Sequence, residues 1–498
     1  MGSVADTLAE AGFDVTVLMP VLEEKFGNKT GLTSVKKIIF HPGDKRVIEL
    51  VKRTSGTANS SGEWNIWTMQ PSALSVLSSM MGYVKDITRF NCENIMNDKS
   101  LMDRLRAEKF DLAIAEHCHI CGIALFDYLQ IPSIVGASSS VQLVGVSNAI
   151  GEPLAVSYVP DLFAESGDRM SLFQRVKNLA SSLMFRYFAD SVHRNELEGV
   201  ESVVGKKNWM DLMAKISFNF VNSNPYLDFP SPTLPKTIPI GGIVPTRKKS
   251  SDLVLSKEWS EILNRRKKNV LISFGTNALS SAMPNEYKRS FISLFKSMPE
   301  TTFIWKYELD DDITKGVDNV VLTKWMPQDQ LLADNRLSLF ITHGGLGSTN
   351  ELAHSGKPAI VIPIMADQRR NGEMLVRHNT AIVYLKEDLA DVERFKSTVG
   401  ELLANKIYTQ KAKRLAELLN SRPFSAKELV VKHCELAAKF GTLPELDSYG
   451  RHLNLLQYYL IDVVLLIITA ILVVVYIIYK ILTFLICKCI PSRKQKKD

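Results

Sequence analysis

Cysteine and long apolar runs are scarce through most of this 498-residue sequence. Of the six cysteines, only Cys92, Cys118, Cys121 and Cys434 precede the C-terminal region, too few for a small scaffold held by disulfides. No low-complexity segment or internal repeat is present. The hydrophobic and charged fractions, 46% and 23%, are those of an ordinary globular protein. Because this length exceeds what one hydrophobic core supports, we expect two domains.

A cleavable leader sequence is also lacking at the N-terminus. Apolar side chains at Val4, Leu8 and Ala11 predict a helix that Gly12 stops. Residues 13–19 alternate and are rich in β-branched side chains, which is typical of a strand. A helix followed by a strand is the second half of a βαβ unit. We therefore expect the first strand, normally in the middle of the sheet, to be absent and the N-terminal domain to be incomplete at its start.

Excess basic charge is lacking outside the C-terminus, although the formal net charge is +7. The charged residues from the C-terminal end carry a net charge of +5 and leave +2 for the rest of the chain. They are Lys480, Lys488, Arg493, Lys494, Lys496, Lys497 and Asp498. This distribution gives no reason to expect a nucleic-acid partner and instead marks the edge of a membrane.

An apolar stretch precedes this basic cluster. Residues 463–479 contain no charge, and the stretch continues to 487, which is long enough to cross a bilayer. The alternative, a buried helix of a soluble domain, fits less well because the stretch is apolar on every side. We expect a single transmembrane helix at 463–487, with the basic tail 488–498 in the cytosol and the large domains in the lumen.

The C-terminal tail and two sequons refine the expected location. Residues 494–498 fit the K-x-K-x-x pattern for retrieval to the endoplasmic reticulum, the alternative being a plain solvated tail. In the lumen, Asn28 and Asn59 would be acceptors for glycosylation, which predicts a glycoprotein. Cys487 and Cys489 lie at the cytosolic membrane edge, where reversible acylation occurs.

Strand and helix signals alternate on both sides of a proline-rich connector. In the first half, 110–115 and 131–135 read as strands around a helix at 122–129. In the second half, strands are expected at 269–274, 302–307, 319–323, 337–341 and 358–363. The predicted division is an acceptor-binding domain 1–221, a linker 222–245, a second α/β domain 246–440 and a juxtamembrane segment 441–462. This order predicts an α/β fold of two facing doubly wound domains, with ligands beyond the carboxyl ends of the strands.

The sharpest local pattern is Thr-His-Gly-Gly-Leu-Gly-Ser-Thr-Asn-Glu at 342–351. Glycines after a strand let the backbone approach an anion, and the following helix offers free N–H groups and a positive dipole end. His343 at the strand end is suited to a hydrogen bond with a diphosphate. An alternative is purely structural: Ser348 as N-cap and Glu351 three residues later would form a capping box.

Taken together, these motifs resemble a known family. Trp-Met-Pro-Gln at 325–328, the 343–351 pattern, Pro363 and Asp367-Gln368, in that order, look like the signature of UDP-glycosyltransferases of the UDP-glucuronosyltransferase branch. Ser-Phe-Gly-Thr at 273–276 and the C-terminal anchor match as well, so the resemblance covers essentially the whole chain. It implies two Rossmann-like domains of the GT-B type.

The resemblance also implies roles for individual residues. Trp325 would stack on uracil, Gln328 would bind the base or ribose, and Glu351 would bind the ribose hydroxyls. The diphosphate would be held by His343, Gly345 and Ser348, with Gly275 and Thr276 approaching from the facing loop. Asp367 and Gln368 would read the sugar hydroxyls. Singly, Trp325 reads equally well as a core tryptophan before a proline turn.

In the resembling family, a histidine near the N-terminus removes the acceptor's proton, an aspartate orients it, and UDP leaves without a metal or other cofactor. This chain departs from that pattern twice. The base histidine belongs just upstream of Met1 and is not in the chain. Glu116 stands at the aspartate position, where it keeps the charge and reaches about one methylene further.

The residues after Glu116 invite other interpretations. Glu-His-Cys-His-Ile-Cys at 116–121 holds four metal-ligand types, but adjacent residues on one loop rarely span a tetrahedron. A redox pair of Cys118 and Cys121 is a second alternative. The interpretation we favour places His117 and His119 at or beside the acceptor pocket.

The leading hypothesis is an inverting glycosyltransferase that moves glucuronic acid or another hexose from UDP to a hydroxyl of a small lipophilic acceptor, as in detoxification. The alternative is a non-catalytic membrane-anchored protein that binds UDP-sugar or serves as a partner subunit, because the base histidine is absent. A single-span receptor is disfavoured by the short tail. Self-association into a homo-oligomer is left open.

Overall fold

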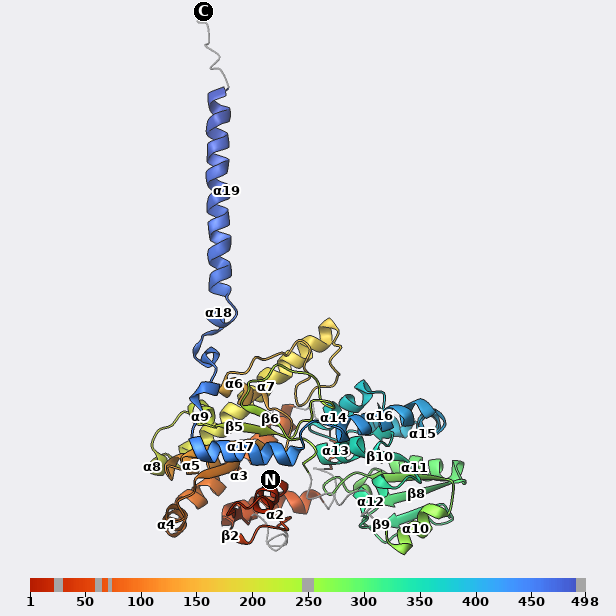
Figure 1. Ribbon diagram of the computed structural model, residues 1–498. Coiled ribbons are helices and arrows are strands. Elements are labelled where there is room, and N and C mark those ends of the chain that lie inside the picture. The colour runs from red at the N-terminus through yellow and green to blue at the C-terminus, as the bar shows by residue number, and fades with distance from the viewer. Residues whose placement is uncertain (22–29, 59–64, 70–73, 244–254, 490–498) are drawn as a thin grey trace, which may run out of the picture. The chain divides into compact units, whose positions relative to one another are not determined.

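The computed structural model describes residues 1–21, 30–58, 65–69, 74–243 and 255–489 (Figure 1). The chain divides into two units, residues 1–447 and 448–498. The sequon at 59–61, the retrieval pattern at 494–498 and the asparagine of the sequon at 28–30 lie outside the described residues.

The second half of the large unit forms one sheet of six parallel strands. Their order is β12-β11-β10-β7-β8-β9, the 6-5-4-1-2-3 arrangement of a doubly wound nucleotide-binding fold. The bounds are β7 Lys268–Ser273, β8 Thr301–Lys306, β9 Val320–Thr323, β10 Leu337–Thr342, β11 Ala359–Val361 and β12 Ala381–Val383. The five strands expected in this half are confirmed. β12 was not expected because three residues are too short for a periodic signal.

Side chains of this sheet alternate between two cores, so both faces are covered. Val270 and Ile272 of β7 pack with α11 and α15, whereas Leu271 packs with α10, α13 and α14 on the other face. The helices of this half are α10 Lys257–Asn264, α11 Asn285–Ser297, α12 Gln328–Ala333, α13 Leu346–Ser355, α14 Gln368–Arg377, α15 Val392–Ala404, α16 Lys406–Asn420 and α17 Ala426–Phe440. Burial on both faces explains why these strands read as continuous apolar runs.

The first half holds two separate parallel sheets within the described residues. One pairs β1 Thr16–Pro20 with β2 Lys37–His41, and the other has the order β3-β4-β5-β6. Its strands are β3 Leu112–Glu116, β4 Ser133–Ser138, β5 Phe218–Val221 and β6 Thr237–Pro239. β6 falls inside the segment predicted as an extended linker. Its one proline, Pro239, is tolerated because β6 is an edge strand of the sheet.

Helices cover these two sheets. They are α1 Gly2–Glu10, α2 Lys45–Ala58, α3 Leu74–Met96, α4 Lys99–Ala107, α5 Cys121–Tyr128, α6 Val144–Ile150, α7 Leu172–Gly199, α8 Glu201–Val204 and α9 Trp209–Ala214. The predicted helix before Gly12, the strand after it and the helix near 122–129 are confirmed as α1, β1 and α5. Asp6 of α1 accepts hydrogen bonds from the N–H groups of Thr33, Ser34 and Val35, which holds the chain between β1 and β2.

The two halves interlock in both directions. Val430, Cys434 and Ala437 of α17, late in the chain, pack in the core beneath β4 and β5 of the first half. Conversely, Trp67 is buried in the core of the six-stranded sheet, where it contacts Phe274 edge-on with 4.9 Å between the ring centroids. Its indole N–H donates to the carbonyl oxygen of Leu279 at 2.9 Å. These exchanges make residues 1–447 one compact unit.

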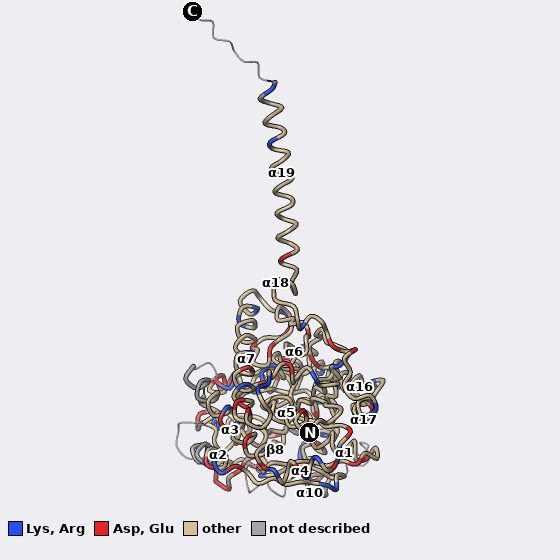
Figure 2. Tube along the Cα trace, turned by 90° about the vertical axis from the view of Figure 1, so that its left-hand side faces the viewer, with Lys and Arg blue, Asp and Glu red and all other residues tan. Residues whose placement is uncertain are grey.

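The second unit contains the short helix α18 Leu455–Tyr458 and the long helix α19 Ile461–Cys489. Residues Ile461–Ile486 are long and apolar enough to cross a membrane, with a mean hydropathy of 3.1. Figure 2 shows almost no charge along α19, whose charged residues are Asp462, Lys480 and Lys488. The helix predicted at 463–487 is therefore present.

Trp67→Ala tests the packing of the first half into the second. We expect a loss of about 3–5 kcal/mol in the free energy of unfolding, because a large buried aromatic side chain and its hydrogen bond are removed. Thermal unfolding of the detergent-solubilised protein measures the change. Trp325→Ala is the matched control: that side chain is 76% exposed, so its removal leaves the melting temperature unchanged. Equal effects of the two substitutions would contradict this packing.

Candidate active site

The candidate site lies where the strand order of the six-stranded sheet reverses, between β7 and β10. Ser273 and Thr342, the last residues of these two strands, are paired, so the loops that follow them lie side by side. This point is the usual ligand crevice of a doubly wound sheet. Gly275 is the second residue of one loop and His343 is the first residue of the other, so the structure brings these two predicted residues together.

Glycine is needed at two positions that touch the His343 ring. A Cβ at Gly275, whose φ is +81°, would lie 2.9 Å from the ring, and a Cβ at Gly345 would lie 2.7 Å from its Nε2. Burial, and to a lesser extent the positive charge of Lys306, lower the pKa of His343 to about 4. The imidazole is therefore neutral at pH 7. Its Nδ1 is buried and has no partner among the described residues.

Lys306 supplies the positive charge of this crevice. Its Nζ donates to the carbonyl oxygen of Gly275 at 2.6 Å. Lys306 lies outside the motifs that predicted the site. The available signal was its place as the last residue of a buried strand, where side chains border the crevice.

Three of the residues predicted to bind the UDP-sugar form one hydrogen-bonded group. The Gln328 amide nitrogen donates to Ser348 Oγ at 3.1 Å and to Glu351 Oε2 at 2.7 Å. The capping-box interpretation of Ser348 and Glu351 is wrong. α13 begins at Leu346 with Gly345 as its N-cap, so both side chains lie inside the helix and face Gln328. Among the described residues, no side-chain hydrogen bond caps the start of α13, which leaves its first N–H groups for a ligand.

Trp325 lies on the loop between β9 and α12 and is 76% exposed. Its backbone is fixed on both sides by Thr323, whose hydroxyl donates to the Trp325 carbonyl oxygen and accepts from its N–H. The interpretation of Trp325 as a core side chain is therefore wrong. A rigidly held, exposed indole offers a flat face for stacking.

Asp367 and Gln368 stand at the start of α14, beside the glycine loop. The Asn371 amide nitrogen donates to Asp367 Oδ2 at 2.8 Å and to the Gly344 carbonyl oxygen at 3.0 Å. Gln368 Oε1 accepts from the N–H groups of residues 364 and 365, so only its amide nitrogen is left for a ligand. Ala366, just before them, has φ +56°, a strained value for a residue with a Cβ.

Glu116 ends β3 in the first half of the chain. Its Oε1 accepts from both the N–H and the hydroxyl of Ser139, at 2.8 and 2.5 Å. These bonds fix the carboxylate at the carboxyl edge of its sheet, as the sequence predicted for position 116. No hydrogen bond to Oε2 is present among the described residues, so this oxygen is available to orient another group.

The loop after Glu116 differs from its sequence interpretations. His117 is fully buried and packs against Gly136, so its side chain does not line a pocket. The expectation that His117 and His119 lie beside the acceptor pocket stays a prediction. Cys121 forms a disulfide with Cys92 of α3 and not with Cys118, which excludes the Cys118–Cys121 redox pair. With Cys121 in the disulfide and His117 in the core, the zinc interpretation loses two of its ligands. No group of three such ligand side chains occurs in the described part of the chain.

A buried carboxyl group supports this loop from α7. Glu196 is 1% exposed, and its Oε2 accepts from the Ile120 N–H at 2.8 Å. Burial raises the pKa of Glu196 to about 8. His119 lies 3.7 Å away, and His193 one turn earlier contacts the Cys118 carbonyl oxygen at 3.1 Å. Glu196 therefore holds its proton at neutral pH.

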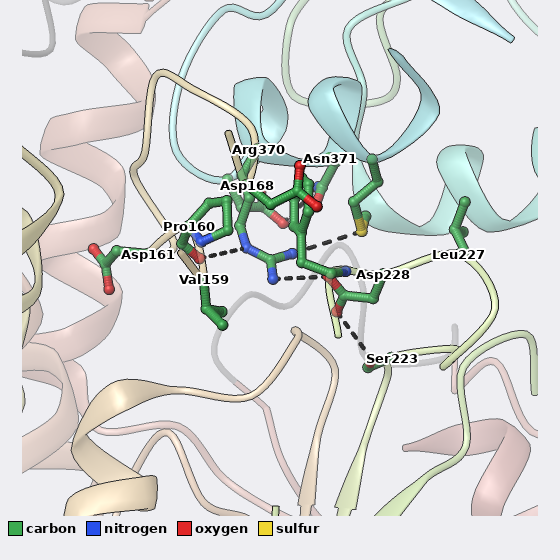
Figure 3. A network of polar contacts seen from close by, with 12 residues as sticks. Val159, Pro160, Asp161, Asp168, Ser223, Leu227, Asp228, Arg370 and Asn371 are labelled. Atoms are coloured by element: carbon green, nitrogen blue, oxygen red, sulfur yellow. Dashed lines mark hydrogen bonds and ion pairs between the residues drawn. The ribbon is translucent and has the colours of Figure 1, made fainter. Parts of the chain in front are cut away.

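Arg370 connects the site to the first half of the chain (Figure 3). Its guanidinium donates to Asp228 Oδ1 at 2.8 Å and to the Pro160 carbonyl oxygen at 3.1 Å. Both members of this ion pair are buried, with 5% and 9% of their side chains exposed. Ser223 donates to the other Asp228 oxygen at 2.9 Å. Sequence reasoning missed Arg370 because its partners lie 142 and 210 residues away.

A cavity of about 320 Å³ lies next to this ion pair. Its walls come from residues 142–162, from the connector between 221 and 239, and from Ser182 of α7. Arg370 contributes to the lining, but none of the predicted donor residues and not Glu116 does so. The cavity is therefore distinct from the crevice at the switch point.

Comparison with known proteins shows the family and the fold of the chain. A sequence profile of the family described as "UDP-glucoronosyl and UDP-glucosyl transferase" matches residues 1–497. The chain belongs to this family. UDP-glucuronosyltransferase 1A9 of Mus musculus is 26% identical over 502 residues, which covers 100% of this chain and 91% of the mouse protein. The Caenorhabditis elegans protein ugt-48 is 30% identical over 423 residues, 82% of this chain and 78% of the relative.

Solved structures confirm the GT-B fold expected for this glycosyltransferase. The glycosyltransferase VinC, solved with dTDP, has a TM-score of 0.58 at 14% identity and covers 88% of this chain and 96% of its own. Os79 from O. sativa, solved with UDP, has a TM-score of 0.55 at 16% identity, with the same coverage. Transferases of this family and fold need no cofactor beyond the nucleotide-sugar donor.

The Arg370–Asp228 pair is tested by a double-mutant cycle in this glycosyltransferase. Arg370→Met leaves a buried carboxylate without its partner, and we expect a loss of about 3–5 kcal/mol in stability. Adding Asp228→Asn removes the unpaired charge, so the double variant recovers most of the melting temperature. Thermal unfolding of Arg370→Met, of Asp228→Asn, of the double variant and of the parent gives the coupling free energy between the two side chains. Strictly additive losses would show that the two side chains act independently.

Glu196→Gln tests the protonated carboxyl group. Between about pH 4.5 and 8 the unfolded state ionises Glu196, whereas the folded state retains the proton. The parent protein therefore loses stability relative to the variant as pH rises through this window, by about 1 kcal/mol per pH unit. Melting temperatures of both proteins at pH 5.5, 6.5 and 7.5 measure the change. A constant difference across these pH values would mean that Glu196 is ionised in the folded protein.

Proposed function

We propose that this glycosyltransferase moves glucuronic acid, or another hexose, from its UDP conjugate to a hydroxyl of a small lipophilic acceptor, with inversion at the anomeric carbon. The observation that carries the proposal is the convergence of Gly275, His343 and the start of α13 at the strand-order reversal. The named relatives include a mouse UDP-glucuronosyltransferase, which supports a UDP-sugar as donor.

In this proposal the uridine lies between Trp325 and the hydrogen-bonded group of Gln328, Ser348 and Glu351. The exposed indole stacks on the base, and Glu351, held by Gln328, accepts from the ribose hydroxyls. A carboxylate suits this role because vicinal hydroxyls are donors. The same hydrogen bond makes Gln328 a positioning residue for Glu351 as well as a contact to the nucleoside.

The diphosphate then lies over the glycine loops. Neutral His343 donates one hydrogen bond, Gly345 and Ser348 present the N-terminus of α13, and Gly275 and Thr276 approach from the β7 loop. Lys306 adds the full positive charge that the neutral histidine lacks. These groups would stabilise the charge that builds on UDP as it leaves.

Asp367 and the free amide nitrogen of Gln368 read the sugar hydroxyls in this arrangement. The acceptor hydroxyl attacks the anomeric carbon from the opposite side, and its proton passes to a base, which in the resembling family is a histidine. Glu116 Oε2 is the group of this chain that would orient such a base. The new glycosidic bond forms as the bond to UDP breaks. Two hydrogen bonds from Ser139 hold the Glu116 carboxylate in one position, which suits a group that orients a base.

We further propose that the protein is anchored in the endoplasmic reticulum membrane with residues 1–447 in the lumen. The Cys92–Cys121 disulfide supports an oxidising compartment, and α19 has the length and apolarity of a membrane anchor. The basic residues after α19 favour a cytosolic C-terminus. A membrane location also concentrates lipophilic acceptors near the enzyme.

The test compares donor binding with sugar transfer. Asp367→Ala in the full-length protein should abolish transfer to phenolic acceptors but leave the UDP affinity within about two-fold. The reason is that, in this proposal, Asp367 contacts the sugar of the donor and not its UDP part. Trp325→Ala should weaken UDP binding about 10-fold or more, since stacking on a base is worth about 1–3 kcal/mol. Calorimetry with UDP and product analysis over a panel of UDP-sugars measure the two effects.

Matched variants separate the outcomes. Trp325→Phe keeps a flat ring and should retain most of the UDP affinity. Full transfer by Asp367→Ala would remove that residue from the sugar site. UDP binding by the parent protein without transfer from any UDP-sugar would favour the non-catalytic, donor-binding alternative.

A further inference from the structure

A short segment of the first half of the chain, residues 65–69, docks on the second half, and we call it the brace. Hydrogen bonds within the brace shape it into a turn. Asn65 Oδ1 accepts from the Trp67 N–H at 3.0 Å, and the Asn65 carbonyl oxygen accepts from the N–H and the hydroxyl of Thr68, both at 3.0 Å. The amide nitrogen of Asn65 and the indole N–H of Trp67 are thereby left to donate elsewhere.

Both of these donors reach the loop that follows β7, residues 274–284, which we call the β7 loop. The Asn65 amide nitrogen donates to the Ala282 carbonyl oxygen at 2.8 Å, and the Trp67 indole N–H donates to that of Leu279 at 2.9 Å. In the proposed function, this loop carries two of the residues that bind the diphosphate. One side of the brace is therefore fixed to the loop proposed for the diphosphate.

A buried lysine joins the brace to a second loop. Lys386 begins the 3-10 helix that follows β12, and it is 4% exposed. Its Nζ donates to the carbonyl oxygens of Ile66 and Met69 in the brace, at 3.1 and 2.7 Å, and to that of Ile364 at 3.4 Å. Ile364 lies between β11 and α14, in residues 362–367, which we call the β11 loop. One ammonium group therefore connects the brace with the β11 loop.

The β11 loop leads directly into the residues assigned to the sugar. Gln368 Oε1 accepts from the N–H groups of Ile364 and Met365 at 2.8 and 3.0 Å. The peptide unit between 364 and 365 is therefore held on both sides: its C=O accepts from Lys386, and its N–H donates to Gln368. The next residue, Ala366, has φ +56°, a strained value that persists only where the surroundings fix it. Lys386 is thus connected to the Gln368 side chain through one peptide unit.

The burial of Lys386 is unfavourable by itself, because an ammonium group loses its water. Burial lowers the pKa of Lys386, and the negative charge of Glu387 opposes this only in part. An apolar side chain of similar length would fill the same space without that cost. What the lysine adds is its three hydrogen bonds, and each of them ends on the backbone of the brace or of the β11 loop. Lys386 is therefore suited to hold these two backbone segments together.

Strand pairing in the six-stranded sheet does not set the distance between the β7 loop and the β11 loop. β10 lies between β7 and β11, which puts these two strands about 10 Å apart. Their loops extend beyond the strands, where ladder bonds no longer constrain them. The brace is bonded to the β7 loop and, through Lys386, to the β11 loop, so it fixes the spacing that the sheet leaves open.

We propose that the brace sets the spacing of the two loops that hold the UDP-sugar, and that Lys386 is a positioning residue for the sugar of the donor. These roles rest on the proposed function, in which the β7 loop binds the diphosphate and Asp367 and Gln368 read the sugar. A displacement of about 1 Å in such a group costs on the order of 100-fold in rate. The first half of the chain thereby acts on donor recognition through backbone contacts, apart from its role toward the acceptor.

Lys386→Met in the full-length protein tests this role, because methionine fills much of the same space but donates no hydrogen bond. Calorimetry without acceptor measures the affinities for UDP, UDP-glucuronic acid and UDP-glucose, and kinetics give kcat and KM for the sugar that the parent transfers. We expect the dissociation constant and the KM of the UDP-sugar to rise about ten-fold or more, whereas the affinity for UDP stays within about three-fold. A loss of folded protein alone would lower kcat and leave KM unchanged.

Lys357→Met is the matched control. Lys357 is also buried, with 8% exposed, and its Nζ donates to the Asp334 carbonyl oxygen at 2.8 Å. It precedes β11, at the opposite edge of the sheet from the donor loops. We expect this variant to lose a similar amount of thermal stability but to keep the KM of the parent. Equal changes of KM in the two variants, or an unchanged KM in Lys386→Met, would overturn the positioning role.

Trp67→Phe tests the other side of the brace and keeps an aromatic ring in the core. It removes the donor to the Leu279 carbonyl oxygen, so we expect the KM of the UDP-sugar to rise about three-fold or more. Combined with Lys386→Met, it should add less than its separate effect, because both substitutions release the same brace. Strictly additive effects, or an unchanged KM in Trp67→Phe, would show that the brace does not set the spacing of the loops.

The parent protein separates a failure of this role from a failure of the proposed function. If the parent binds UDP and transfers a sugar but Lys386→Met behaves like Lys357→Met, only the role of the brace is refuted. If the parent binds neither UDP nor a UDP-sugar, the proposed function is refuted, and the positioning role with it.

Discussion

Beside the candidate site, the two halves of the large unit are joined by one buried ion pair, Arg370 with Asp228. Two charges removed from water are stable only when geometry and further hydrogen bonds satisfy both. Here the Pro160 carbonyl oxygen and the Ser223 hydroxyl complete the shell. These partners come from the first half of the chain and its connector, whereas Arg370 belongs to α14. Asp367 and Gln368 stand at the start of the same helix, so in the proposed function the contact that joins the halves also positions the residues that read the sugar.

The sequence predicted well those features that local patterns encode. β7 and β10 are buried on both faces, so each reads as a continuous apolar run that ends at a glycine loop. Once the order of such strands is known, the meeting of Gly275 with His343 follows. The capping box failed for a local reason as well: a Ser-x-x-Glu pattern marks a helix start only when the backbone before it is extended, and here the helix had already begun at Leu346.

What the sequence did not predict depends on contacts between distant residues. Arg370 looks like any helical arginine until Asp228 is brought to it by the fold. Trp67 belongs to the first half of the chain and yet packs in the core of the six-stranded sheet of the second half. Cys121 of α5 forms a disulfide with Cys92 of α3, although Cys118 is nearer in sequence. No periodicity encodes these choices, because they follow from which surfaces the topology brings together. The separation of β1–β2 from β3–β6 belongs to the same class.

The electrostatics of the donor crevice follow from burial. A histidine packed between two glycines is desolvated, so His343 is neutral and can donate a hydrogen bond but supplies no charge. Transferases of this family use no metal, so the positive charge opposite a leaving diphosphate has to come from the protein. Lys306 is placed for this by its bond to the Gly275 carbonyl oxygen, and the N-terminus of α13 adds a partial charge. In the proposed function, Lys306 and the N-terminus of α13 thus take the place of a divalent cation. Glycine is required at 275 and 345 because a Cβ at either position would collide with the His343 ring.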